Sequence, residues 1–188
     1  MSRRLESVDE TRQRIAAATF ELHSEIGPAQ TTISAVAERA GVQRNTVYKH
    51  FPDLNSLFEA CTAHGLEVWG VPDGDRWRSI PDPVERLRHG LTEIYRVYRA
   101  NARSVGMILR DLPMYADVGG WGEFDDRMAR MFATLAEGWA EPPAGAVRAA
   151  AIRHALSFET WRSLTDGGLA DDQARDLMVD LVTRSGGG

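Results

Sequence analysis

The sequence predicts an all-α protein, and three observations support that fold class. Apolar residues recur at the three- and four-residue spacing of a helix along most of the 188 residues. No segment alternates apolar and polar residues convincingly, as a half-buried strand would. Glycine and proline gather between the periodic segments, where helices end. The pattern indicates about nine helices, and ordinary apolar content is enough for a sizeable core.

The first expected helix follows a basic arm at residues 1–6. Ser7 and Glu10 form a capping box, in which two side chains satisfy free backbone amides of the first turn. This helix continues to about Ile26. His23 within it is expected at the edge of the core.

Residues 31–51 form the segment around which the rest of the chain is organised: two short helices joined by a turn at Gly41. Thr31 or Thr32 caps the first helix, because a hydroxyl can accept a hydrogen bond from a backbone amide there. Glycine at position 41 supplies the positive φ of a tight reversal. The apolar residues of this segment that face inward are Ile33, Val36, Ala37, Ala40, Val42 and Val47.

The second short helix leaves a polar and cationic face outward, as a DNA-reading helix-turn-helix requires. Arg44 can pair with guanine through two hydrogen bonds, and Asn45 can reach an adenine or shape the helix start. Tyr48, Lys49 and His50 are expected to hold phosphates. An ordinary corner between two helices, with Tyr48 only packed and His50 only solvated, is the alternative. The expected DNA contacts are Thr31, Thr32, Gln43, Arg44, Asn45, Thr46, Tyr48, Lys49 and His50.

The net charge of -5 argues against a broadly basic nucleic-acid surface, so any DNA contact must come from local clustering. Such a cluster exists in the first third of the chain: Arg3, Arg4, Arg12, Arg14, Arg44 and Lys49. Cys61 is the single cysteine, so an intramolecular disulfide is excluded and a reducing cytosol fits. No signal peptide and no membrane-length apolar run is found, so we expect a soluble, cytoplasmic protein.

Six more helices are expected after the two short ones. Asp82, Pro83 and Glu85 mark a strong start, with an acidic N-cap, proline at the first helical position and an acid in the first turn. Residues 70–83 have no period and are expected to be a loop between the two halves of the chain. The later helices are expected near residues 53–69, 83–98, 103–112, 121–139, 144–165 and 171–183.

Residues 15–57 resemble the DNA-binding domain of the tetracycline-repressor (TetR) family of bacterial transcriptional regulators. The likeness rests on Gly27 with Thr32, Val36-Ala37, Ala40-Gly41-Val42 and the run from Thr46 to Pro52. It implies a helix-turn-helix DNA-binding domain at residues 1–53 and a helical effector-binding and dimerisation domain at residues 54–188. It also implies a homodimeric repressor of an inverted-repeat DNA operator, released by a small-molecule effector.

Three positions depart from the family's usual pattern. Gln43 stands where a serine commonly caps the recognition helix, and glutamine is a poor cap. Leu54 stands where a lysine often meets the DNA backbone. His23 stands where a core aromatic is common. The first two departures leave more of the binding to Arg44, Tyr48 and Lys49.

The second half of the chain is expected to hold the effector and the dimer interface. An apolar effector with one polar or anionic group is expected, met by Arg110 or His154. For each single residue, ordinary core packing is the stronger interpretation. The expected effector contacts are Met107, Arg110, Trp121, Phe124, Met128, His154, Phe158 and Trp161. The expected dimer contacts are Ile152, Leu156, Leu164, Leu177, Met178, Leu181 and Val182.

The sequence does not favour an enzyme. It has neither a nucleophile elbow nor a phosphate-binding glycine loop, and its five histidines lack metal-ligand spacing. We therefore expect no cofactor and no metal site. The alternative to a DNA-binding regulator is a helical interaction or ligand-binding protein that does not bind DNA.

Overall fold

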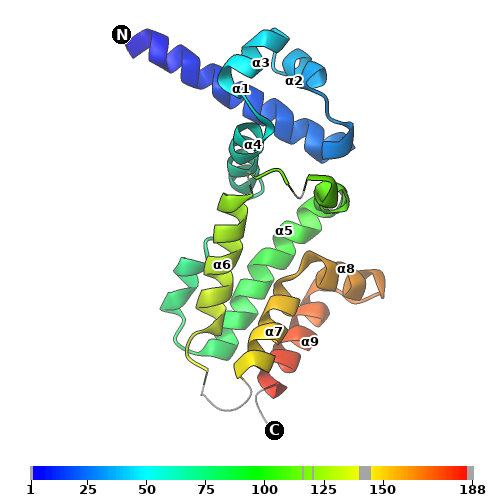
Figure 1. The fold of residues 1–188 in the computed structure, drawn as a ribbon. Helices are drawn as coiled ribbons and strands as arrows, with labels where there is room; N and C mark the ends of the chain where they lie inside the picture. The colour runs from blue at the N-terminus through cyan, green and yellow to red at the C-terminus, as the bar shows by residue number, and fades with distance from the viewer. Residues whose placement is uncertain (1, 116, 120, 140–144, 186–188) are drawn as a thin grey trace. The chain divides into compact units, whose positions relative to one another are not determined.

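A computed structural model describes residues 2–115, 117–119, 121–139 and 145–185 (Figure 1). These residues form nine α-helices and three short 3-10 helices, and none of them lies in a strand. The predicted all-α class and the predicted number of helices are therefore confirmed for the described part of the chain. No helix in these ranges is long and apolar enough to cross a membrane.

The chain divides into two compact units. Unit 1 consists of residues 1–70 with residues 103–125, and unit 2 consists of residues 71–102 with residues 126–188. The division is one of compactness, whereas the boundary expected after residue 53 concerns function and stays a prediction.

Unit 1 begins with four helices: α1 (Ser2–Ile26), α2 (Ile33–Arg39), α3 (Arg44–His50) and α4 (Leu54–Val68). Helix α1 is longer than expected. The predicted basic arm at residues 1–6 is wrong from residue 2 onward, and Ser7 lies inside the helix instead of capping it. The segment contains neither glycine nor proline, so nothing in it breaks the helix.

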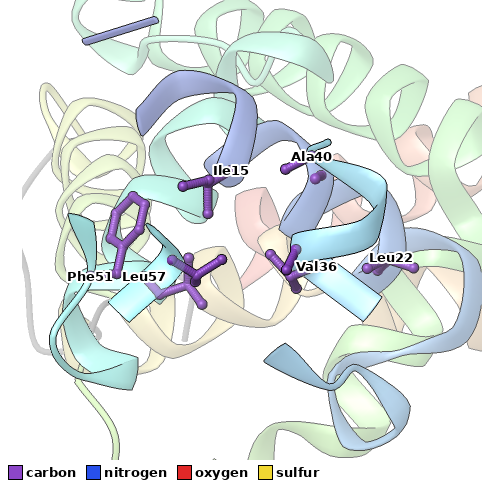
Figure 2. Packing of buried hydrophobic residues seen from close by; sticks show 9 residues of the cluster. Ile15, Leu22, Val36, Ala40, Phe51 and Leu57 are labelled. Atoms are coloured by element: carbon purple, nitrogen blue, oxygen red, sulfur yellow. The ribbon is translucent and has the colours of Figure 1, made fainter. Parts of the chain in front are cut away.

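The core of unit 1 is built where α1, α2, α3 and the start of α4 meet (Figure 2). Its buried members are Ile15, Ala18, Leu22, Val36, Ala37, Ala40, Val47, Phe51 and Leu57. Further along α1 and α4, the two helices approach closely at Gly65. A Cβ atom at that position would lie 2.5 Å from Cε2 of Phe20, so only glycine fits without a shift.

His23 lies in this unit's interior, with 4% of its surface exposed, and not at the edge as predicted. Its ring meets the Phe58 ring edge-on at 5.2 Å between centroids, and its Nδ1 lies 3.6 Å from Sγ of Cys61. Burial lowers the pKa of His23 to about 4, against a smaller opposing effect of the Asp111 carboxylate. Burial also raises the pKa of the Cys61 thiol to about 12, so the thiol keeps its proton at neutral pH. His23 therefore acts as a neutral core ring.

Residues 103–125 complete unit 1. Asp111, at the end of α5 (Pro83–Asp111), is 4% exposed and accepts a hydrogen bond from the Ala29 amide at 3.0 Å. Arg110 donates to the same carboxylate and holds its pKa below the usual range. Tyr115 in η3 (Leu112–Tyr115) donates to the Pro28 carbonyl at 3.1 Å. Side chains near the end of α5 thus hold the turn η1 (Pro28–Gln30) that leads into α2.

Unit 2 begins with the segment that was expected to be a loop. Its residues Gly74–Ser79 form the 3-10 helix η2, and Trp77 within it is 2% exposed. Trp77 donates its indole N–H to Glu93 of α5 at 2.7 Å. The helix α5 starts as predicted, because Oδ1 of Asp82 accepts the amide of Glu85 at 2.8 Å. Helix α5 covers the two helices expected at 83–98 and 103–112, and a kink with non-helical dihedrals at Asn101 separates them.

The remaining helices are α6 (Gly122–Ala136), α7 (Gly145–Leu156), α8 (Phe158–Asp166) and α9 (Asp171–Arg184). The single helix expected over 144–165 is wrong, since Ser157 interrupts it; Ala144 lies outside the described residues. Ser157 has extended dihedrals, and its hydroxyl accepts the amide of Glu159. Helix α7 packs against both α8 and α9. The end of α9 is as predicted to within one residue.

Candidate DNA-binding site

The turn between α2 and α3 has the geometry of a helix-turn-helix. Gly41 has φ +66°, as predicted, and its amide donates to the Glu38 carbonyl at 3.1 Å. The next amide, that of Val42, donates to the Ala37 carbonyl at 2.9 Å. These two bonds close the end of α2 and direct the chain into α3.

Helix α3 has one buried residue and a polar outer face. Val47 is fully buried in the unit 1 core, while Arg44, Asn45, Tyr48 and Lys49 are exposed. The remaining predicted contacts on this element are Thr46 and His50, both half-buried, and Gln43, which is exposed and makes no side-chain cap as its identity predicts. The face predicted to read DNA is therefore presented to solvent by a helix anchored at a single valine and at its C-terminal Phe51.

Arg44 and Tyr48 are linked on this face. The Arg44 guanidinium donates to the Tyr48 hydroxyl at 2.9 Å and lies 5.5 Å from the centroid of the Tyr48 ring. The two residues are four positions apart, which places their side chains side by side on a helix. The sequence assigned them separate contacts, whereas the structure brings them together.

The two threonines before α2 have different roles. The Thr32 hydroxyl accepts the amide of Ala35 at 3.1 Å and is the N-cap. The Thr31 hydroxyl donates to the Gly27 carbonyl at 2.9 Å. Both hydroxyls thus have partners within the protein. The Thr32 hydroxyl still has its hydrogen to donate to a phosphate, whereas the Thr31 hydroxyl already donates its hydrogen to Gly27.

The departure at Leu54 is visible at the start of α4. Asp53 caps this helix by accepting the amide of Ser56 at 2.8 Å, and that bond lowers the pKa of its carboxyl. Leu54 follows with 43% of its surface exposed. An exposed leucine therefore stands where a phosphate-binding lysine was expected from the family.

The residues predicted to line an effector site are divided between the two units. Met107, Arg110, Trp121 and Phe124 belong to unit 1, and Met128, His154, Phe158 and Trp161 belong to unit 2. Phe158 and Trp161 are buried core residues, with ring centroids 5.5 Å apart. The guanidinium of Arg110 is occupied by Asp111. His154 is exposed and contacts the Thr160 hydroxyl at 3.1 Å.

Unit 2 contains an open groove of about 330 Å³ lined by Met128, Ala129, Phe132, Arg153 and Leu156. The Arg153 guanidinium lies 4.0 Å from the centroid of the Phe132 ring. Of these five residues, only Met128 is in the predicted effector set. Helical spacing could have found the others, because Met128 and Phe132 are four residues apart and Arg153 and Leu156 are three apart.

The predicted dimer residues divide by burial. Ile152, Leu156, Met178 and Val182 are buried within unit 2, so their side chains are already covered by their own chain. Leu177 and Leu181 are 46% and 43% exposed on α9, and Leu164 on α8 is half-buried. Only the last three are available to a partner. The predicted set therefore combines buried and exposed residues of the same helices, and its role in dimerisation stays a prediction.

The fold and the outer face of α3 define a protein of the helix-turn-helix class. A family model described as "Bacterial regulatory proteins, tetR family" matches residues 15–61, which run from α1 into α4. The match confirms, for residues 15–61, the likeness to this family that the sequence predicted.

Two relatives are named as regulators of the helix-turn-helix type. The chain is 32% identical over 129 residues to the HTH-type transcriptional repressor KstR of Rhodococcus jostii (strain RHA1), a match covering 66% of this chain and 58% of KstR. A BetI regulator of Ectopseudomonas mendocina (strain ymp) is 31% identical over 75 residues, 40% of this chain and 38% of BetI. The chain thus spans less than two thirds of either relative.

The fold is shared over nearly the whole chain with two solved structures. The protein SCO7518 of Streptomyces coelicolor A3(2) superposes with a TM-score of 0.63 at 21% identity, covering 95% of this chain and 99% of that one. NalD, the secondary repressor of the MexAB-OprM multidrug efflux pump in Pseudomonas aeruginosa, gives a TM-score of 0.60 at 19% identity, with 96% and 97% covered.

Proposed function

We propose that this protein is a dimeric, cytoplasmic transcriptional regulator that binds an inverted repeat of double-stranded DNA, acts as a repressor and is released by a small-molecule effector. One observation carries the DNA-binding part. A helix with one buried valine, Val47, presents Arg44, Tyr48 and Lys49 outward from a helix-turn-helix.

The roles of the exposed residues follow from their chemistry. Arg44 reads a guanine, because a guanidinium can donate two parallel hydrogen bonds to O6 and N7. Lys49 meets a phosphate, which holds the protein in register without reading sequence. The net charge of -5 makes this local contact necessary, since the protein as a whole repels DNA.

The test compares two substitutions on a duplex taken from upstream of the protein's own gene. Arg44→Ala should reduce discrimination between this duplex and versions altered at single base pairs, by about 1–3 kcal/mol at one position. Lys49→Ala should weaken binding to all sequences alike and reduce the salt slope by about one unit. Unchanged affinity and specificity in Arg44→Ala would show that this residue reads no base.

The dimer is supported by the exposed leucines of α9. A single helix-turn-helix covers one half-site, so two copies are needed for two successive major grooves. Leu177 and Leu181 lie one turn apart and form an apolar surface that a second copy of α9 can cover. Leu181→Glu should shift the protein to a monomer in sedimentation, while Asp180→Ala on the same helix should not. A wild-type monomer at micromolar concentration would contradict the dimer.

The groove of unit 2 is our candidate effector site. Its lining is apolar except for Arg153, whose guanidinium makes a ring contact but no hydrogen bond or ion pair among the described residues. An apolar ligand with an anionic group fits that lining. Laurate should reduce affinity for the operator duplex, dodecylamine should not, and Arg153→Ala should abolish the laurate effect. Equal effects of both amphiphiles would contradict a site based on Arg153.

A further inference from the structure

Arg12 of α1 reaches the C-terminal end of α3. Its Nη1 donates a hydrogen bond to the backbone carbonyl of His50 at 2.8 Å. The centre of its guanidinium lies 4.2 Å from the centroid of the Phe51 ring, which is 2% exposed. The side chain is half-buried, so the contact is shielded in part from water. One guanidinium therefore joins α1 to the two residues at which α3 ends.

Helix α3 has few other means of holding its position. It has seven residues, too few for a helix to be stable alone, and Gln43 gives it no side-chain cap. The carbonyls that follow Val47 have no amide partner within the helix and carry partial negative charge, which a cation stabilises. The amide of Phe51 donates to the Val47 carbonyl at 2.8 Å, and this is the last backbone hydrogen bond of the helix. Arg12 acts on this last turn.

We propose that Arg12 is a positioning residue for DNA recognition, which fixes the C-terminal turn of α3 without touching DNA. The inference rests on the proposed function, because α3 must be the DNA-reading helix. Tyr48 and Lys49 lie in the turn that Arg12 holds, so their placement depends on it. By sequence, Arg12 belongs to the basic cluster expected to contact DNA. In the structure its guanidinium contacts the His50 carbonyl and the buried Phe51 ring.

Arg14 provides a matched control. It lies two residues further along α1, has the same charge, and is exposed. Among the described residues it has no hydrogen-bond or ion-pair partner. Arg14→Ala therefore removes the same charge from the same helix without removing a contact to α3.

The first measurement uses the protein without DNA. Hydrogen exchange of the Phe51 amide should accelerate about tenfold or more in Arg12→Ala, because a hydrogen bond from a charged donor is lost, and should stay unchanged in Arg14→Ala. Arg12→Lys, which keeps the charge but not the flat group that stacks on Phe51, should fall between the two. Unchanged exchange in Arg12→Ala would overturn the proposal.

The second measurement uses a duplex that the wild-type protein selects from a random-sequence pool. At a temperature where circular dichroism shows full helicity, Arg12→Ala should bind this duplex about tenfold more weakly or worse, with an unchanged salt slope. Arg14→Ala should bind as the wild type does. In the Arg12→Ala background, Lys49→Ala should cost less than in the wild type, since the lysine is already displaced. A purely structural role would leave the fully folded variant's affinity unchanged.

Three results would overturn the proposal. A salt slope reduced by about one unit in Arg12→Ala would mean that Arg12 itself contacts a phosphate. An equal loss in Arg14→Ala would mean that the charge of α1 matters and not the contact. Independent effects of Arg12→Ala and Lys49→Ala would mean that the last turn is not displaced. If the wild type selects no duplex, the proposed function fails, whereas the exchange measurement still decides whether Arg12 holds α3.

Discussion

His23 should make the stability of unit 1 depend on pH in a range where most carboxylates do not titrate. The perturbation is acidification from pH 7 to pH 5, compared between the wild type and His23→Phe. Phenylalanine keeps an aromatic ring against Phe58 and has no proton to gain. The comparison therefore isolates the imidazole.

The magnitude follows from the pKa of His23 in the two states. In the unfolded chain it is 6.5, and burial lowers it to about 4 in the folded protein. Between these values the unfolded state binds a proton that the folded state does not, so stability is present above pH 6.5 and is lost as pH falls toward 4. At about 1.4 kcal/mol for each pH unit, the loss between pH 6.5 and pH 5 is about 2 kcal/mol.

Native-state hydrogen exchange of the α1 amides is the appropriate assay, because these amides lie in unit 1 and report the free energy of opening at that place. The difference in opening free energy between the wild type and His23→Phe should change by about 2 kcal/mol between pH 7 and pH 5. A constant difference over this range would refute the reasoning, since it would mean that the imidazole titrates equally in both states.

Two further substitutions test the packing and the helix ends. Gly65→Ala places a Cβ 2.5 Å from the Phe20 ring, so the overpacking cost of about 1–3 kcal/mol should exceed the gain of about 1 kcal/mol in helix propensity. Gly122→Ala has no atom within 4 Å of the new Cβ and should not destabilise the protein. Urea unfolding of both variants measures the two effects. Ser157→Ala removes the acceptor of the Glu159 amide and should lower the stability of unit 2 by about 1 kcal/mol in exchange of α8 amides; no change would show that packing alone starts α8.

Where the signals were local, the sequence was sufficient. The cap at Thr31 or Thr32, the positive φ of Gly41 and the cap at Asp82 each depend on residues within four positions, and the structure has Thr32, Gly41 and Asp82 in these roles. The outer face of α3 follows from the same local information, because one buried Val47 in a short helix fixes which side chains face outward. The predicted DNA-contacting role of that face stays a prediction.

Where the structure depends on distant contacts, the sequence was insufficient. Ser157 interrupts an alanine-rich segment although neither glycine nor proline lies within ten residues before the break, and the residues that follow it are placed by the burial of Phe158 and Trp161. Trp77 orders its glycine- and proline-rich segment by packing into unit 2. Helical spacing shows which residues share a face but not what covers it, and for this reason the predicted effector and dimer sets mixed core with surface.

The separation of roles within α3 has a consequence for how new binding specificities can arise. Only Val47 among its seven residues is buried, so exchanges at Arg44, Asn45 and Lys49 leave the hydrophobic core intact. Substitutions on exposed positions usually change stability by less than about 0.5 kcal/mol. The outer face can therefore diversify through many single steps, each of which leaves a folded protein. A lineage carrying this scaffold can change the sequence it reads while keeping the same architecture.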